Sequence, residues 1–240
     1  MISRSAVYSP ARAAATSLCA LASKITLSES DEMMMFRLAL KTTICARKTP
    51  GLYDRNFLLG AYAENIAMEK LRKAAQSTGN DMNIEFSPIL DGEETRSYRF
   101  QKGNNGNIWV IDKKTKQYTT ELDGLVVVED IPHVVEIKMG KYTHDAYTPA
   151  GTLTRIVRCP HSLKALPPVL EYFKEHRGYD YVPLGVIIGL PHDSFEAITP
   201  KVEKRFRKAG GNFLVHSRTL QGKHDLVARL AKEEDIQLVA

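Results

Sequence analysis

The sequence predicts an α/β fold, with helices flanking a central mixed β-sheet. Three observations favour this class. Residues 54–77 place apolar side chains at approximately helical spacing, with charges between them. Residues 126–128 and 134–137 are rich in β-branched side chains, which suit strands buried in a sheet. Further helix-like and strand-like stretches follow toward the C-terminus.

Residues 1–50 are expected to form an N-terminal helical extension, and 51–240 the α/β domain. Ser9 could cap a first, alanine-rich helix, with Pro10 at its first position. A second helix is expected to start near Ser30 and to end at the Thr-Pro-Gly sequence that begins at residue 49. This extension could serve in dimerisation or in contact with the substrate.

The other expected elements follow in chain order. They are a helix at 54–77, strands at 83–90 and 108–112, a turn at 113–116, two strands around 123–129 and 133–139, a helix at 168–176, a strand at 182–190, a helix at 199–209, a strand at 212–216 and a helix at 224–234.

The composition narrows the functional classes. The net charge of +5 favours a polyanionic partner but identifies none. No apolar run approaches the roughly 20 residues that span a bilayer, so no membrane partner is expected. The three cysteines form no CxxC pair, which favours buried thiols in a reducing, cytoplasmic setting. The first 28 residues are basic and lack acids, so organellar import stays open beside an ordinary helix.

Three charged residues interrupt the valine-rich strands. Asp123 opens one strand, and Glu136 and Lys138 lie on the next, where alternate side chains share a face. A hairpin through 129–132 would bring Asp123 beside Glu136. The alternative is an unremarkable ion pair on a solvated sheet face, with the Asp-Gly sequence as a plain turn.

Such a convergence suits the hydrolysis of phosphodiesters. The carboxylates of Asp123 and Glu136 could hold Mg²⁺, for which Mn²⁺ could substitute, and the backbone carbonyl of Ile137 could add a ligand. A bound metal polarises the phosphoryl oxygen and lowers the pKa of its water. Lys138 could then position that water or stabilise developing negative charge.

The segment 120–140, TELDGLVVVEDIPHVVEIKMG, resembles the catalytic core of the PD-(D/E)xK nuclease superfamily, which includes archaeal Holliday junction resolvases and many restriction endonucleases. The resemblance covers about residues 55–190. It implies a restriction-endonuclease-like αβββαβ core and Mg²⁺ dependence. It also implies that Asp123 and Glu136 bind metal, that Lys138 is the catalytic lysine, and that Glu64 is the helical glutamate, with Glu69 as the alternative.

The chain departs from that family's pattern in two places. Leu122 stands where the family has proline. The connection from Lys73 to Asp123 is longer than in compact resolvases, which predicts an inserted strand or hairpin. Basic residues after the Glu-x-Lys sequence could line a nucleic-acid track or form a solvated face, and they are Lys141, Arg155, Arg158 and Lys164.

The sequence therefore predicts a metal-dependent nuclease that hydrolyses DNA, with structure-specific cleavage at junctions or in repair as the favoured form. A catalytically inactive nuclease-fold subunit for nucleic-acid binding or assembly is one alternative, and an RNA-processing nuclease is another. His133, His144 and His161 show no metal-binding spacing and are expected to be surface or hydrogen-bonded residues.

Overall fold

The computed structural model describes residues 4–43, 49–79, 81–103, 107–137, 160–178, 185–189, 213–217 and 224–239. Its described helices are α1 (Arg4–Lys24), α2 (Glu29–Thr42), α3 (Arg55–Thr78), α5 (Pro160–His176) and α7 (His224–Glu233). Its described strands are β1 (Leu52–Asp54), β2 (Ile84–Phe86), β3 (Tyr98–Lys102), β4 (Ile108–Asp112), β5 (Tyr118–Leu122), β6 (Gly124–Val128), β7 (Ile131–Ile137), β8 (Gly185–Gly189), β9 (Phe213–Ser217) and β10 (Gln237–Val239).

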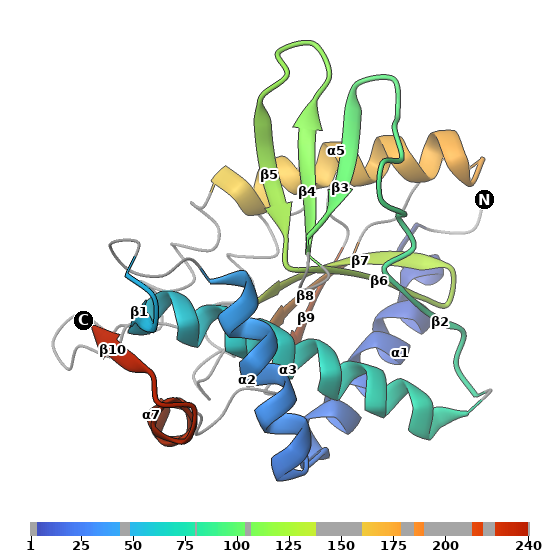
Figure 1. Cartoon of the computed structure of the whole chain (residues 1–240). Coiled ribbons are helices and arrows are strands. Elements are labelled where there is room, and N and C mark those ends of the chain that lie inside the picture. Colours follow the sequence, from blue (N-terminus) through green and yellow to red (C-terminus); the bar gives the residue numbers. More distant parts are fainter. Residues whose placement is uncertain are drawn as a thin grey trace, which may run out of the picture.

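The central sheet has five strands in the order β2-β6-β7-β8-β9. Its first three strands pair antiparallel, and β7, β8 and β9 pair parallel. Strands β3, β4 and β5 form a separate antiparallel sheet, which is the insertion predicted before Asp123. In Figure 1 this small sheet and α5 lie on one side of β6 and β7, while α1, α2 and α3 lie on the other. The predicted α/β class is confirmed.

Strands β6 and β7 form a hairpin with a two-residue turn. Gly124 pairs with Val135 at one end of the ladder and Val128 with Ile131 at the other. The turn residues Glu129 and Asp130 both have positive φ, 49° and 61°. Positive φ at both positions is the type I′ geometry that matches the twist of the strands. The hairpin lies where the sequence predicts it, but its turn is two residues shorter than the predicted 129–132.

The main hydrophobic core lies between the hairpin and α3. Val126, Val128 and Val135 pack there with buried side chains from α1, α2, α3 and α7. Gly124 lets α3 approach closely, because a Cβ atom at that position would lie 2.7 Å from Sδ of Met68. Cys19 is buried in this core, as predicted. No described helix is long and apolar enough to cross a membrane.

The N-terminal helices differ from the prediction at their ends. α1 begins at Arg4, so Pro10 lies inside the helix and Ser9 is no cap. A proline costs a helix one hydrogen bond, which the packing of an alanine-rich helix can offset. Ser28, rather than Ser30, caps α2, and its hydroxyl and backbone form a capping box with Asp31. α2 ends at Thr42, because the next residue adopts an extended backbone.

Other boundaries were also wrong. α5 begins at Pro160 and contains both Pro167 and Pro168, whereas the prediction started the helix at 168. β2 is short because Ser87 has a φ of 51°, outside the strand region. Strands β8 and β9 and helix α7 occur close to where they were predicted. The β1–β10 pair and the strands β3 and β5 on either side of β4 were not predicted, and the helix at 199–209 lies outside the described residues.

Candidate functional site

Asp123 lies at the open end of the hairpin, between β5 and β6. The last pair of the ladder joins Gly124 to Val135. Asp123 directly precedes Gly124 in a bend outside the strand, and Glu136 directly follows Val135 in β7. β7 extends through Glu136 to Ile137, although the side chains of these two residues lie outside the description. The register therefore brings the two predicted acidic positions together.

Glu64 lies on α3, the helix that packs against the hairpin, as predicted. It is half-buried and precedes Met68 by one helical turn, so the two residues share a face of α3. A Cβ atom at Gly124 would lie 2.7 Å from the sulfur of Met68, so position 124 faces α3, as does its partner Val135. By strand alternation, positions 123 and 136 belong to the opposite face of the sheet, away from Glu64. Glu69, the alternative, pairs with Arg72 at 3.7 Å.

Asn107, Tyr118 and Glu121 form a hydrogen-bonded cluster at the end of β5 that leads to Asp123. The carboxylate of Glu121 accepts hydrogen bonds from the side-chain amide of Asn107 and from the hydroxyl of Tyr118, the latter at 3.4 Å. Partial burial, then Glu121 and then the charge of Asp123, raise the pKa of Tyr118. The two carboxylates therefore concentrate negative charge at this end of β5, which favours a bound cation.

A β-bulge explains why this cluster escaped sequence analysis. Val110 pairs with Thr120 while the next residue of β4, Ile111, pairs with Tyr118, so Thr119 is an extra residue in β5. In a regular strand, Tyr118 and Glu121 would point to opposite faces. The bulge turns both toward the same face.

The other predicted site residues are only partly within the description. Lys138, Lys141, Arg155 and Arg158 lie outside it, and so does the side chain of Lys164, whose backbone belongs to α5. Within the described ranges, no group of three or more His, Cys, Asp or Glu side chains is arranged to hold a metal. The side chain of Glu136 lies outside those ranges. The candidate donors, two carboxylates and a backbone carbonyl, are oxygen ligands, which suit Mg²⁺.

His133 lies in the middle of the hairpin, where it is fully buried. Its Nδ1 atom lies 2.8 Å from the backbone oxygen of Ile131. Burial lowers the pKa of the imidazole to about 4, because desolvation disfavours the charged ring. His133 is thus a hydrogen-bonded histidine of the sheet, as predicted.

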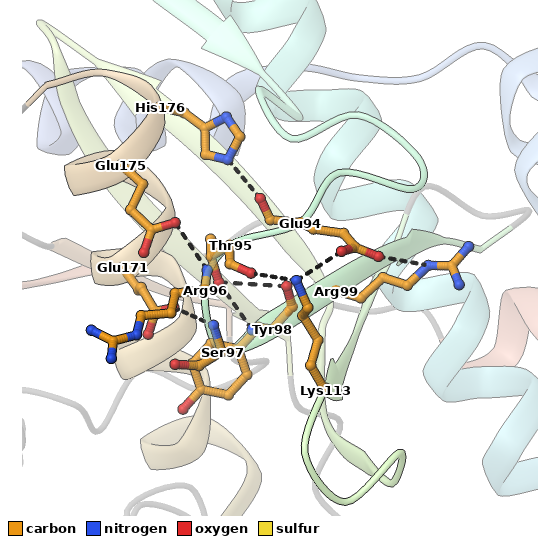
Figure 2. A network of polar contacts seen from close by, with 10 residues as sticks. All are labelled: Glu94, Thr95, Arg96, Ser97, Tyr98, Arg99, Lys113, Glu171, Glu175 and His176. Carbon is orange, nitrogen blue, oxygen red and sulfur yellow. Dashed lines mark hydrogen bonds and ion pairs between the residues drawn. The ribbon is translucent and has the colours of Figure 1, made fainter.

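Helix α5 is attached to the chain just before β3 by hydrogen bonds from backbone groups (Figure 2). The Glu171 carboxylate accepts the N–H of Ser97 at 2.7 Å, and the Glu175 carboxylate accepts the N–H of Arg96 at 3.0 Å. Each acid thus binds one of two consecutive backbone donors. Because β5 packs on α5 and leads into Asp123, these contacts help to fix the frame that carries the candidate site.

The same network continues to the β4–β5 turn (Figure 2). Nε2 of His176 lies 2.8 Å from the backbone oxygen of Glu94. The Glu94 carboxylate binds Lys113 at 2.8 Å, and Lys113 also donates to the backbone oxygen of Thr95 at 3.0 Å. The ammonium of Lys113 lowers the pKa of Glu94. These cross-contacts join the small sheet to α5 as one unit.

No family model, curated protein or solved structure matches the chain. The functional interpretation therefore rests on the residues, their register and their charge.

Proposed function

We propose that this chain is a metal-dependent nuclease that hydrolyses DNA phosphodiester bonds, with its site at the open end of the β6–β7 hairpin. The register of that hairpin carries the proposal, because Asp123 and Glu136 directly adjoin its last pair, Gly124 and Val135. Two carboxylates at neighbouring positions can share one Mg²⁺ or Mn²⁺ ion through oxygen ligands. Partial burial of Asp123 keeps such a site from being fully solvated.

The order of the elements supports a restriction-endonuclease-like core. Helix α3 is followed by three antiparallel strands of the central sheet (β2, β6 and β7), then by α5 and by β8, which is parallel to β7. This is an αβββαβ order with β3–β5 inserted between its first two strands. The insertion agrees with the long connection noted in the sequence.

Each residue of the site has a distinct role in the proposed reaction. Asp123 and Glu136 would hold the metal, which when bound supplies charge stabilisation to the phosphate and a more acidic water. Lys138, two residues beyond Glu136 in the sequence, would donate to the attacking water or to a phosphate oxygen. Glu121 would add negative charge that attracts the cation, whereas Glu64, on the α3 side of the sheet, has no role in this scheme.

The test is a cleavage assay with end-labelled duplexes, forks, four-way junctions and single strands of DNA and RNA, in Mg²⁺, Mn²⁺ or EDTA. We expect metal-dependent cleavage of DNA. Glu136→Gln should slow it at least about 1,000-fold, since loss of a metal ligand costs several kcal/mol of transition-state stabilisation. Thermal unfolding of each variant checks the fold.

Glu129→Gln is the matched control. It makes the same substitution at the other end of the same hairpin, where an amide oxygen can still accept the Asn83 N–H. Its cleavage rate should stay within about two-fold of the wild type, a change of less than about 0.5 kcal/mol. Cleavage of RNA alone would support the RNA-processing alternative. Tight binding without cleavage of any substrate would support the inactive subunit.

A further inference from the structure

The small sheet has one face against α5 and one face toward solvent. Phe100, Val110 and Thr120 form a buried row across its three strands, and the Phe100 ring packs edge-on against Tyr172 of α5 at 5.5 Å. The residues between them point the other way. In Figure 1, α5 crosses behind β3, β4 and β5, and no labelled element lies in front of them.

Two exposed aromatic side chains occupy this outer face. Trp109, in the central strand, is 39% exposed, and Tyr118, in the neighbouring strand, is 50% exposed. Trp109 pairs with Glu121, and Ile111 with Tyr118, so the two rings are diagonal neighbours about 7–8 Å apart at the backbone. Aromatic rings on the open face of an antiparallel sheet are platforms on which unpaired bases stack.

The segment that forms the small sheet has a small excess of basic residues. Residues 93–121 contain six basic and four acidic residues, a net charge of +2. Lys114 and Lys116 are exposed in the β4–β5 turn, and the Arg99 side chain is 58% exposed on the outer face. Glu94 lies 3.9 Å from Arg99 but 2.8 Å from Lys113, so its closer partner is Lys113 (Figure 2).

One acid, Glu121, also lies on the outer face. Its carboxylate is engaged by the Asn107 amide and the Tyr118 hydroxyl. The hydrogen bond to Glu121 directs the Tyr118 side chain along β5 toward Asp123. The aromatic face is therefore continuous with the candidate cleavage site, and the negative charge lies at the end where a metal would bind.

We propose that the outer face of β3, β4 and β5 binds single-stranded DNA. Bases stack on Trp109 and Tyr118, phosphates lie against Arg99, Lys114 and Lys116, and the strand continues along β5 to Asp123. This inference rests on the proposed nuclease function and names its substrate class. Duplex DNA keeps its bases paired and stacked inside the helix, so it cannot use the two rings in this way.

Trp109 is the chain's one tryptophan, so its fluorescence reports directly on this face. The full chain is titrated in EDTA with a dT oligonucleotide, a duplex of equal length, an RNA oligonucleotide and heparin. We expect strong quenching by the DNA single strand at lower concentration than by the other three. Equal or tighter binding of the duplex, or quenching by heparin to the same extent, would overturn the proposal. Preferential binding of RNA would overturn its assignment to DNA.

Variants measured with a fluorescently labelled oligonucleotide separate stacking from charge. Trp109→Ala should weaken single-strand binding about 10-fold or more, and Trp109→Phe should retain most of it. Lys114→Gln with Lys116→Gln should weaken binding and reduce its salt dependence. Phe57→Ala is the matched control, because Phe57 is 73% exposed on α3 and away from this face. An unchanged affinity in folded Trp109→Ala protein would refute the stacking role.

The two proposals can fail separately. Binding is measured without metal, so single-strand binding that persists in a protein that cuts nothing would remove the nuclease function and leave the surface. Conversely, the protein could cleave duplex DNA efficiently, and Trp109→Ala could leave that rate unchanged. This result would refute the role of the outer face in substrate binding and would support the nuclease function.

Discussion

The two ends of the β6–β7 hairpin carry similar acids in different surroundings. At the turn end, the Glu129 carboxylate accepts the backbone N–H of Asn83 at 3.0 Å, and the Asp130 carboxylate accepts the Asn83 side-chain amide at 3.1 Å. At the open end, Glu121 and Asp123 both lie close enough to Tyr118 for their charges to raise the pKa of its hydroxyl.

This difference separates structural acids from candidate functional ones. At the turn, the two carboxylates accept N–H groups of Asn83 and so hold the start of β2 beside the hairpin. At the open end, carboxylates gather near one another, which is unfavourable unless a cation joins them. The acids at the turn thus have a structural role that the contacts show, whereas those at the open end are the candidates for a metal site.

The largest expected effect compares the same substitution at both ends. Asp123→Asn should lower the cleavage rate at least about 1,000-fold, because it weakens the metal that provides several kcal/mol. Binding of DNA in EDTA should persist or tighten, since one negative charge facing phosphate is removed. Asp130→Asn should change neither, because asparagine tolerates positive φ and keeps an acceptor for Asn83. Equal rates for the two variants would contradict the functional distinction.

The middle of the hairpin offers a test by pH. The folded state lowers the pKa of His133 from 6.5 to about 4, so the unfolded chain binds the proton first as the pH falls. The free energy of unfolding should therefore fall by up to about 1.4 kcal/mol per unit between pH 6.5 and 4, about 3 kcal/mol in all. Urea denaturation at several pH values measures it.

The control for this prediction is His133→Gln, which cannot titrate. Its stability should depend less on pH in the same window, whatever its absolute value. The pKa of Asp31 is also lowered, from 3.8 to about 2. Its contribution to stability is lost only as the pH falls below about 3.8, which is below the window of His133. A wild-type slope that survives in His133→Gln would show that other groups cause it.

The hairpin and its acid positions could be predicted because few variables define them. β-branched runs indicate strands, and alternation fixes the face that each residue occupies. Once the turn contains two residues, the register follows, and Asp123 and Glu136 adjoin the last pair of the ladder. Helix α3 was equally clear, because its apolar spacing persists over six turns.

The small sheet and its outer face could not be predicted in the same way. β3 and β5 have mixed polar and apolar residues, since only one face is buried and the strands are short. The placement of Tyr118 depends on a bulge, which no local pattern announces. The attachment of α5 joins Ser97 to Glu171, 74 residues apart, so only the folded chain reveals it.

A smaller effect is expected from the glycine at the open end. In Gly124→Ala the new methyl would meet Sδ and Cε of Met68 at 2.7 and 2.9 Å, and Met68 is itself buried. We expect a loss of about 1–2 kcal/mol in unfolding free energy. Gly60→Ala on α3 has open space and should instead stabilise the helix by roughly 0.5–1 kcal/mol. Met68→Ala should lower the unfolding free energy less in the Gly124→Ala background than in the wild type. Additive losses would show that the two side chains do not collide.

The smallest effect tests the structural role of the turn end. Asn83→Ala removes the amide that donates to Asp130 but keeps the backbone N–H that donates to Glu129. Because the lost hydrogen bond is exposed, the unfolding free energy should fall by only about 0.5–1 kcal/mol. A double-mutant cycle with Asp130→Ala should assign most of that loss to the pair, and DNA cleavage should stay at the wild-type rate. A loss of cleavage in folded Asn83→Ala protein would mean that the two ends of the hairpin are coupled, and that their division into structural and functional acids is wrong.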